Sequence, residues 1–145
     1  MGKKMATAKQ VRIYPANRQQ METAIASAKD PELKKAYTEM LEGCLKYPEK
    51  WDWYAMWMIE NEDGIHIGDL CFKGYEDGKN PEVGYGINDE FQGRGYATEA
   101  TKLALEWAFS QSGVMAVEAE TAANQPLHRR VIIVCQPLEQ RLSGA

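Results

Sequence analysis

Residues 83–100 read VGYGINDEFQGRGYATEA, and this stretch predicts a strand, a tight turn and a helix in succession. Residues 83–87 alternate as a strand does, with apolar side chains on one face and two glycines on the other. Two more glycines mark the turn. The helix is predicted over residues 96–111, because apolar residues recur there at helical spacing; the apolar stripe consists of Ala97, Ala100, Ala104, Trp107 and Ala108.

The turn has the properties of an anion-binding site. The first turn of a helix leaves backbone N–H groups without partners and carries the positive end of the helix dipole, so a phosphate is its natural ligand. Gly93 and Gly95 let an anion approach the backbone closely, and Arg94 adds a positive charge. The strand glycines lack the third glycine of a dinucleotide-binding fingerprint, and no Walker-type loop occurs. A plain tight connection is the alternative interpretation.

Two consecutive helices are predicted upstream, between residues 18 and 46. Asn17 is a suitable N-cap for the first, and Asp30 caps the second with Pro31 at its first helical position. Pro48 closes this region.

Strand signals follow the two helices. The apolar run at residues 53–59 predicts a strand buried on both faces. A hairpin turn at 61–64 leads to a second strand over 65–72, paired antiparallel with the first. Residues 76–81 form a further turn-rich connection to the strand at 83–87.

A strand is also predicted after the long helix, which Gly113 ends. Residues 114–121 alternate, with Glu118 and Glu120 on the same side, and the strand–helix–strand unit forms a right-handed crossover. Residues 127–134 suit a helix or a strand equally well. The element order indicates one three-layer domain of class α/β (α+β) over residues 1–145, with a mixed, mostly antiparallel sheet flanked by helices.

Composition narrows the functional classes. The chain has 145 residues, 44% hydrophobic and 26% charged, which suits one sizeable core. The net charge of −4 and the scattered basic residues argue against nucleic acid as a partner. Cys44, Cys71 and Cys135 lie far apart without zinc-site spacing, which favours reduced thiols in a cytoplasm. No apolar run is long enough to span a bilayer, so we expect a cytoplasmic protein without metal or membrane partner.

The segment QGRGYA at residues 92–97 resembles motif A of the GNAT acetyltransferases, Q/R-x-x-G-x-G/A. The sequence pattern of residues 83–100 is similar to that of the RimJ/RimL-like branch of this family. The segment IGDL at residues 67–70 resembles part of the β-hairpin of the same family. The resemblance covers roughly residues 50–124. It implies that backbone amides of this segment hold the pyrophosphate of acetyl-CoA. It also implies that the preceding strand splays from its neighbour and pairs with the pantetheine arm.

The resemblance also implies which residues form the site. The cofactor-binding residues would be Ile87, Asn88, Gln92, Gly93, Arg94, Gly95, Tyr96, Ala97, Thr98 and Asn124. A backbone N–H near Ile87 or Asn88 would stabilise the thioester oxyanion. Glu82 and Glu120 are the candidate catalytic carboxylates, with Glu118 beside them, although each suits a solvated surface equally. His128 lies near the position where relatives place the general acid that protonates the thiolate. It is a weaker candidate for a catalytic role, because a lone histidine is more often simply exposed.

Two regions remain to be placed. Four aromatic residues follow the helical region and are expected to form part of the core and one wall of the pocket: Trp51, Trp53, Tyr54 and Trp57. Residues 18–46 are expected to form the other wall of the acceptor site. The tail at 125–145 departs from the family pattern, since Leu127 replaces the usual serine. A truncated or frame-shifted coding end would explain it, and the resulting exposed sheet edge would favour a homodimer.

These observations favour transfer of an acetyl group from acetyl-CoA to a primary amine of a protein N-terminus or a small molecule. Two alternatives stay open. One is a CoA-binding module with little or no turnover because its C-terminal part is missing. The other is a structural or interaction domain whose glycine-rich turn is only a turn.

Overall fold

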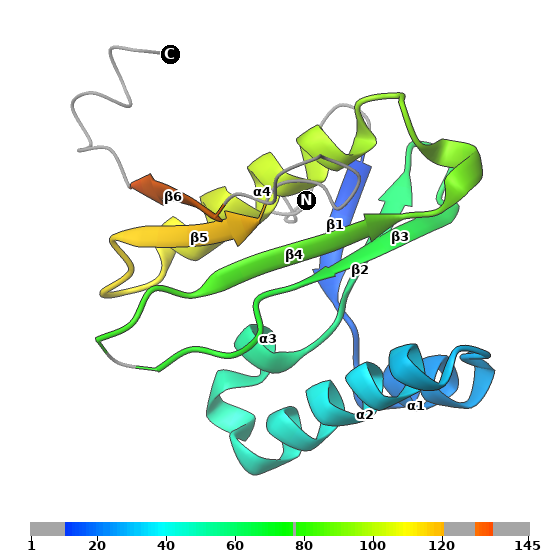
Figure 1. Ribbon diagram of the computed structural model, residues 1–145, viewed down its shortest axis with the longest axis horizontal. Helices are drawn as coiled ribbons and strands as arrows, with labels where there is room; N and C mark the ends of the chain where they lie inside the picture. The colour runs from blue at the N-terminus through cyan, green and yellow to red at the C-terminus, as the bar shows by residue number, and fades with distance from the viewer. Residues whose placement is uncertain (1–10, 77, 121–129, 135–145) are drawn as a thin grey trace.

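A mixed sheet forms the centre of the computed structural model, which describes residues 11–76, 78–120 and 130–134 (Figure 1). Its six strands follow one another in sequence order. Every neighbouring pair is antiparallel except β4 and β5, which are parallel, as a strand–helix–strand crossover requires. The strands are β1 Val11–Pro15, β2 Trp57–Asn61, β3 His66–Cys71, β4 Glu82–Ile87, β5 Ala116–Glu120 and β6 Arg130–Val134.

Four α-helices accompany the sheet in the described residues. They are α1 Arg18–Ser27, α2 Pro31–Lys46, α3 Trp51–Tyr54 and α4 Tyr96–Ser110. Short 3-10 helices at Pro48–Lys50 and Asp89–Phe91 precede α3 and the glycine-rich turn. In Figure 1, α1 and α2 lie side by side and well apart from α4. None of these helices is long and apolar enough to cross a membrane.

The predicted starts of α1 and α2 are confirmed. The Asn17 side chain accepts a hydrogen bond from the Gln20 backbone N–H at 2.8 Å, and the Gln20 side chain accepts one from the Asn17 backbone N–H at 2.9 Å. This reciprocal pair is a capping box. The Asp30 carboxylate accepts from the Glu32 N–H at 3.0 Å, so it caps α2 as expected.

One predicted strand needs correction, and one strand was not predicted. The run at 53–59 is not one strand, because its first part belongs to α3 and β2 begins at Trp57. The Trp57 indole N–H donates to the Asp52 carbonyl at 2.8 Å, and the Ala55 N–H bonds back to the Trp51 carbonyl at 2.9 Å, which closes a helical turn there. The sequence reading also missed β1, whose five residues pair along β2 at the edge of the sheet. For residues 127–134, the strand alternative holds over β6.

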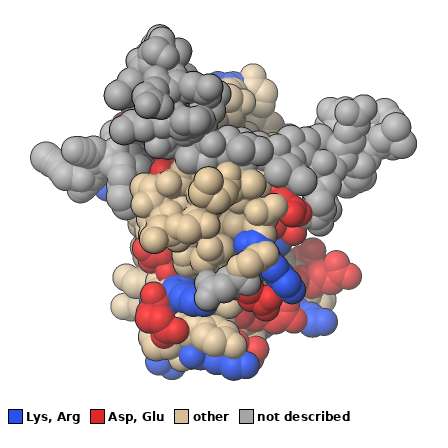
Figure 2. Space-filling view, turned by 90° about the vertical axis from the view of Figure 1, so that its left-hand side faces the viewer, with Lys and Arg blue, Asp and Glu red and all other residues tan. Residues whose placement is uncertain are grey.

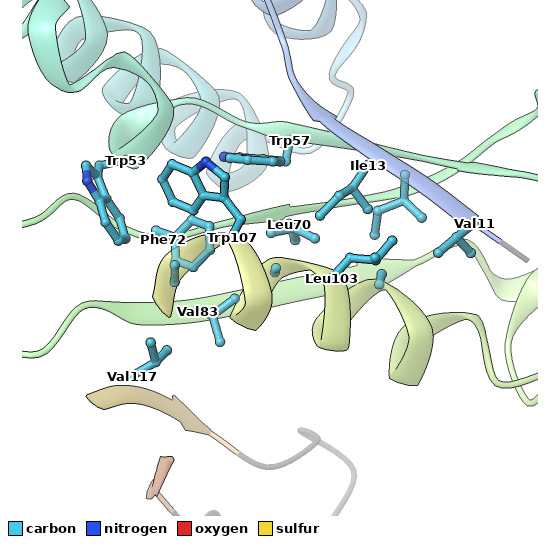
Figure 3. Packing of buried hydrophobic residues seen from close by; sticks show 14 of the residues in the cluster. Val11, Ile13, Trp53, Trp57, Leu70, Phe72, Val83, Leu103, Trp107 and Val117 are labelled. Carbon is cyan, nitrogen blue, oxygen red and sulfur yellow. The ribbon is translucent and has the colours of Figure 1, made fainter. Parts of the chain in front are cut away.

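The main core lies between α4 and one face of the sheet, and aromatic rings dominate it. Figure 3 shows Trp107 of α4 among these rings. Its ring centroid lies 4.6 Å from Trp53, 5.0 Å from Trp57 and 5.2 Å from Phe72. Such offset and edge contacts add to the hydrophobic stabilisation from burial. The expectation that Trp53 and Trp57 are core residues is therefore confirmed.

A second cluster fills the opposite side of the sheet, under α1 and α2. Successive residues of a strand point to opposite faces, and β2 shows this: Trp57 and Ile59 belong to the α4 core, whereas Met58 packs against the second cluster. The buried members of this cluster are Ala16, Met21, Leu41, Cys44, Ala55 and Met56. Two helical layers with a sheet between them make the predicted three-layer architecture.

Close approach of β3 and β4 depends on Gly68. A Cβ at this position would collide with the Gly86 carbonyl oxygen of the neighbouring strand. We expect Gly68→Ala to lower the free energy of unfolding by about 1–3 kcal/mol, the usual cost of overpacking. Urea denaturation measures this. Gly86→Ala is the matched control, because nothing lies within 4 Å of its Cβ position and the change should stay within about 0.5 kcal/mol. Equal losses in the two variants would contradict the steric explanation.

Candidate functional site

The sheet opens between β4 and β5. These strands pair only at Glu82 with Glu118 and at Val83 with Ala119. Along its other edge, β4 pairs with β3 as far as Ile87. Among the described residues, no strand therefore pairs with residues 84–87 on the edge that faces β5. The opening leaves backbone polar groups available to a ligand at the centre of the sheet.

The ladder geometry shows which N–H groups point into this opening. The Asn88 N–H donates to the Ile67 carbonyl of β3 at 2.8 Å. Successive residues of a strand direct their backbone groups to opposite edges, so the Ile87 N–H points away from β3 and into the opening. Of the two oxyanion donors named from the sequence, Asn88 already has a protein acceptor and Ile87 faces the open edge.

Gln92 anchors the loop that follows β4. Its side-chain amide donates to the Ile87 carbonyl at 2.8 Å and to the Asp89 carboxylate at 3.3 Å. The Arg94 guanidinium lies 5.7 Å from the centre of the Phe91 ring, within cation–π range, at the exposed rim of the turn. The glutamine of the motif thus holds the end of β4 and the turn together.

The helix start itself is open. Gly93 and Gly95 have φ values of 78° and 83°, a region that glycine adopts without strain, and Gly95 is the N-cap of α4. The first bond of the helix runs from the Glu99 N–H to the Gly95 carbonyl at 3.1 Å. In the part of the chain that the structure describes, no acceptor is bonded to the backbone N–H groups of residues 93–98. Residues 93–95 are also exposed.

The side chains of the first helical turn divide between core and surface. Tyr96 is buried in the α4 core, and its hydroxyl donates to the Glu62 carboxylate at 3.2 Å. Ala97 is half-buried and Thr98 is exposed. Tyr96 therefore offers only its backbone N–H to a ligand, while its ring fixes the direction of the helix start.

The candidate carboxylates lie at the first paired positions of β4 and β5. Glu82 and Glu118 are cross-strand neighbours on the face turned away from buried Val83. The Lys73 ammonium lies 3.2 Å from the Glu82 carboxylate, and the Asn80 amide donates to Glu118 at 3.4 Å. Acidic and basic side chains intermingle on this side of the molecule, around an uncharged central surface (Figure 2).

Three other predicted residues cannot be placed in the site. Glu120 is the last residue of β5, but its side chain lies outside the described residues. Asn124 and His128 also lie outside them.

Sequence reasoning missed a hydrogen-bonded pair on the sheet face opposite α4. The Tyr37 hydroxyl of α2 donates to the Asp69 carboxylate of β3 at 3.0 Å. Burial raises the pKa of the Asp69 carboxyl, and the hydrogen bond from Tyr37 acts against that rise. The available signal was an aspartate inside the otherwise apolar strand at 67–70.

Comparison with known families gives one match over most of the chain. A family model described as "Acetyltransferase (GNAT) domain" matches residues 6–135. A comparison with curated proteins gave no match.

Solved structures share the fold at low sequence identity. The ribosomal-protein-S5-alanine acetyltransferase from Vibrio fischeri has a TM-score of 0.62 at 11% identity, over 83% of this chain and 75% of that one. RimL, a ribosomal L7/L12 alpha-N-protein acetyltransferase solved with coenzyme A, has a TM-score of 0.60 at 13% identity, over 81% and 74%. A GNAT-family acetyltransferase from Bacillus anthracis has a TM-score of 0.55 at 17% identity, over 83% and 75%. These likenesses confirm the predicted fold class.

Proposed function

Because this chain belongs to the GNAT acetyltransferase family, we propose that it transfers an acetyl group from acetyl-CoA to a primary amine of a protein N-terminus or a small molecule. One observation carries the proposal: the N–H groups of residues 93–98 have no acceptor among the described residues, and residues 93–95 of this turn are exposed. Unsatisfied amides at a helix start, with the positive end of the dipole, suit a diphosphate.

The rest of the co-substrate would lie beside these amides. The diphosphate would lie on the N–H groups of residues 93–98, with Arg94 at the rim. The open edge of residues 84–87 would bond to the amides of the pantetheine arm, as an added strand does. No atom lies within 4 Å of a Cβ position at Gly86, so this part of β4 accepts close approach.

The transfer step needs an oxyanion donor and a base. The Ile87 N–H is the donor that faces the opening, and it would polarise the thioester carbonyl. Glu82 is our candidate base, with the Lys73 ammonium holding its carboxylate at the start of β4; Glu120 remains the second candidate. Glu82 and Ile87 lie at opposite ends of β4, about 16 Å apart in an extended strand, so Glu82 would take the proton of the amine through a chain of waters. The base takes a proton from the ammonium form of the acceptor, and the neutral amine attacks the thioester carbon. A C–N bond forms as the C–S bond breaks, and the second proton lost from nitrogen goes to the departing thiolate.

The role of Glu82 leads to a kinetic prediction. Glu82→Gln removes the base while keeping the shape of the side chain, so we expect kcat to fall about 100-fold or more. The dissociation constant for CoA should change less than about threefold, because residue 82 lies at the far end of β4 from the turn. Glu76→Gln is the control, since this carboxylate is 68% exposed and pairs only with neighbouring Lys79 among the described residues. An unchanged kcat in Glu82→Gln would assign the base elsewhere.

Two measurements test the proposed function. Titration calorimetry with CoA should give a saturable heat, and absence of both heat and thermal stabilisation would exclude the co-substrate. A thiol-release assay with acetyl-CoA and a panel of amines then tests transfer; the panel contains peptides with free N-termini, polyamines and simple alkyl amines. CoA binding without thiol release from any amine would identify a binding module rather than an enzyme.

A further inference from the structure

Asp69 occupies the sheet face on which an acceptor would approach. Its neighbour Leu70 points into the α4 core, so Asp69 points to the opposite face. In the ladder, Asp69 lies between Met58 of β2 and Gly86 of β4. Cross-strand neighbours in an antiparallel pair are about 5 Å apart. The carboxylate therefore lies one strand away from the open edge that would hold the thioester.

Only one oxygen of this carboxylate has a partner among the described residues. Tyr37 donates to Oδ2 at 3.0 Å, and no described group bonds to Oδ1. The described residues also contain no side-chain oxygen or nitrogen that is both buried and without a partner. It follows that Oδ1 is reached by solvent, although the carboxylate as a whole is sufficiently buried for its pKa to be raised.

The strand beside Asp69 leaves space for a ligand. Gly86 has nothing within 4 Å of a Cβ position, and at Gly84 the nearest atom, at 3.4 Å, is in the flexible side chain of Lys73. On this face of β4 the position of Gly86, the cross-strand neighbour of Asp69, is therefore bare, whereas the flexible Lys73 side chain lies over Gly84 and its ammonium pairs with Glu82. Tyr37 closes the other side from α2, in the helical region expected to form the acceptor wall.

We propose that Asp69, held in place by Tyr37, binds the positively charged form of the acceptor amine. This rests on the acetyl transfer proposed above and names the acceptor class: primary amines that are cationic at neutral pH, rather than uncharged aromatic amines. A solvent-reached carboxylate oxygen on the residue paired with the bare position of Gly86 is a suitable partner for an ammonium group. Tyr37 would be a positioning residue, because it acts through Asp69.

The test is a comparison of KM and kcat for the best alkyl amine of the panel. Asp69→Asn should raise the KM for the amine about 10- to 100-fold, the loss expected for one charge-assisted hydrogen bond. The kcat and the dissociation constant for CoA should change less than about threefold. Asp69→Glu restores the charge and should recover part of the affinity. For an aromatic amine, the KM should be the same in wild type and Asp69→Asn.

The pH dependence separates positioning from folding effects. The titratable groups around Asp69 are Tyr37 on α2 and His66 and Cys71 on β3, and the Lys73–Glu82 ion pair lies beyond Cys71 on the same side. Both Tyr37 and His66 lower the pKa of Asp69. Ionised Asp69 binds the amine, so affinity is lost as pH falls through its pKa. Tyr37→Phe removes a hydrogen bond that lowers this pKa, so the rise in KM should begin at higher pH than in wild type. If Tyr37 had only a structural role, the pH at which the KM begins to rise would be the same in Tyr37→Phe and in wild type.

The possible outcomes are distinct. A wild-type protein that fails to bind CoA, or binds it without transfer, refutes the proposed function and the role of Asp69 with it. Normal transfer in wild type with an unchanged KM in Asp69→Asn refutes only the role of Asp69. Should Asp69→Asn bind CoA normally but lose affinity for charged and uncharged amines alike, charge recognition is refuted as well.

Discussion

Replacement of Gly93 by Asp is expected to weaken CoA binding by about 100-fold or more. The new carboxylate would lie beside the unpartnered N–H groups of residues 93–98, where it would compete for them and repel the diphosphate. Like charges brought together at a binding site cost several kcal/mol. The positive φ at this position strains any side chain, but the strain is shared by the control variant described below, nothing lies within 4 Å of the Cβ position, and a negative charge near a helix start interacts favourably with the dipole. Titration calorimetry measures the loss.

Gly93→Asn is the matched control for this variant. Both side chains have the same shape, and both tolerate the positive φ of 78° at this position better than other residues do. Only the charge differs. We expect Asn to weaken CoA binding less than about tenfold. Equal affinities in the Asp and Asn variants would place the diphosphate away from this turn.

Trp107→Ala should lower the free energy of unfolding by about 3–5 kcal/mol, the range for truncation of a large buried aromatic residue. The indole is 6% exposed and contacts three other rings at centroid distances of 4.6 to 5.2 Å. Its removal leaves a cavity at the centre of the α4 core, which the rigid neighbours Trp53 and Trp57 fill poorly. Chemical denaturation followed by circular dichroism measures the change.

Met115→Ala provides the comparison, since Met115 lies in the connection from α4 to β5, immediately before β5, and is 68% exposed. Its effect should stay within about 0.5 kcal/mol. A loss in Trp107→Ala no larger than in Met115→Ala would mean that α4 does not depend on the aromatic cluster.

The elements that carry their own local signals could be predicted from the sequence. Asn17 and Asp30 cap their helices because their short side chains reach the first free N–H groups, whatever the rest of the chain does. The strand, turn and helix over residues 83–110 could be predicted in the same way, because the spacing of apolar residues and the positions of the glycines determine these elements within the segment itself. The fold and the exposed amides of the turn followed from this one stretch.

Other features depend on contacts between distant residues, and local patterns do not record them. The Tyr37–Asp69 hydrogen bond joins residues 32 positions apart. β1 is short and becomes a strand through its pairing with β2, about 46 residues later in the sequence. The helical turn of α3 within an apolar run reflects how Trp53 and Trp57 pack against Trp107, which strand propensity alone cannot anticipate.

Only two residues of β4 pair with β5, and this short pairing affects how the two parts of the sheet are held together. Beyond Val83 and Ala119, the first four strands and the β5–β6 hairpin are joined by side-chain packing on α4 rather than by a continuous ladder. A co-substrate bonded to residues 84–87 would act as a surrogate strand and supply part of that missing backbone bonding. A bound co-substrate would then hold β4 and β5 together, and the melting temperature of the protein would rise with the concentration of the co-substrate.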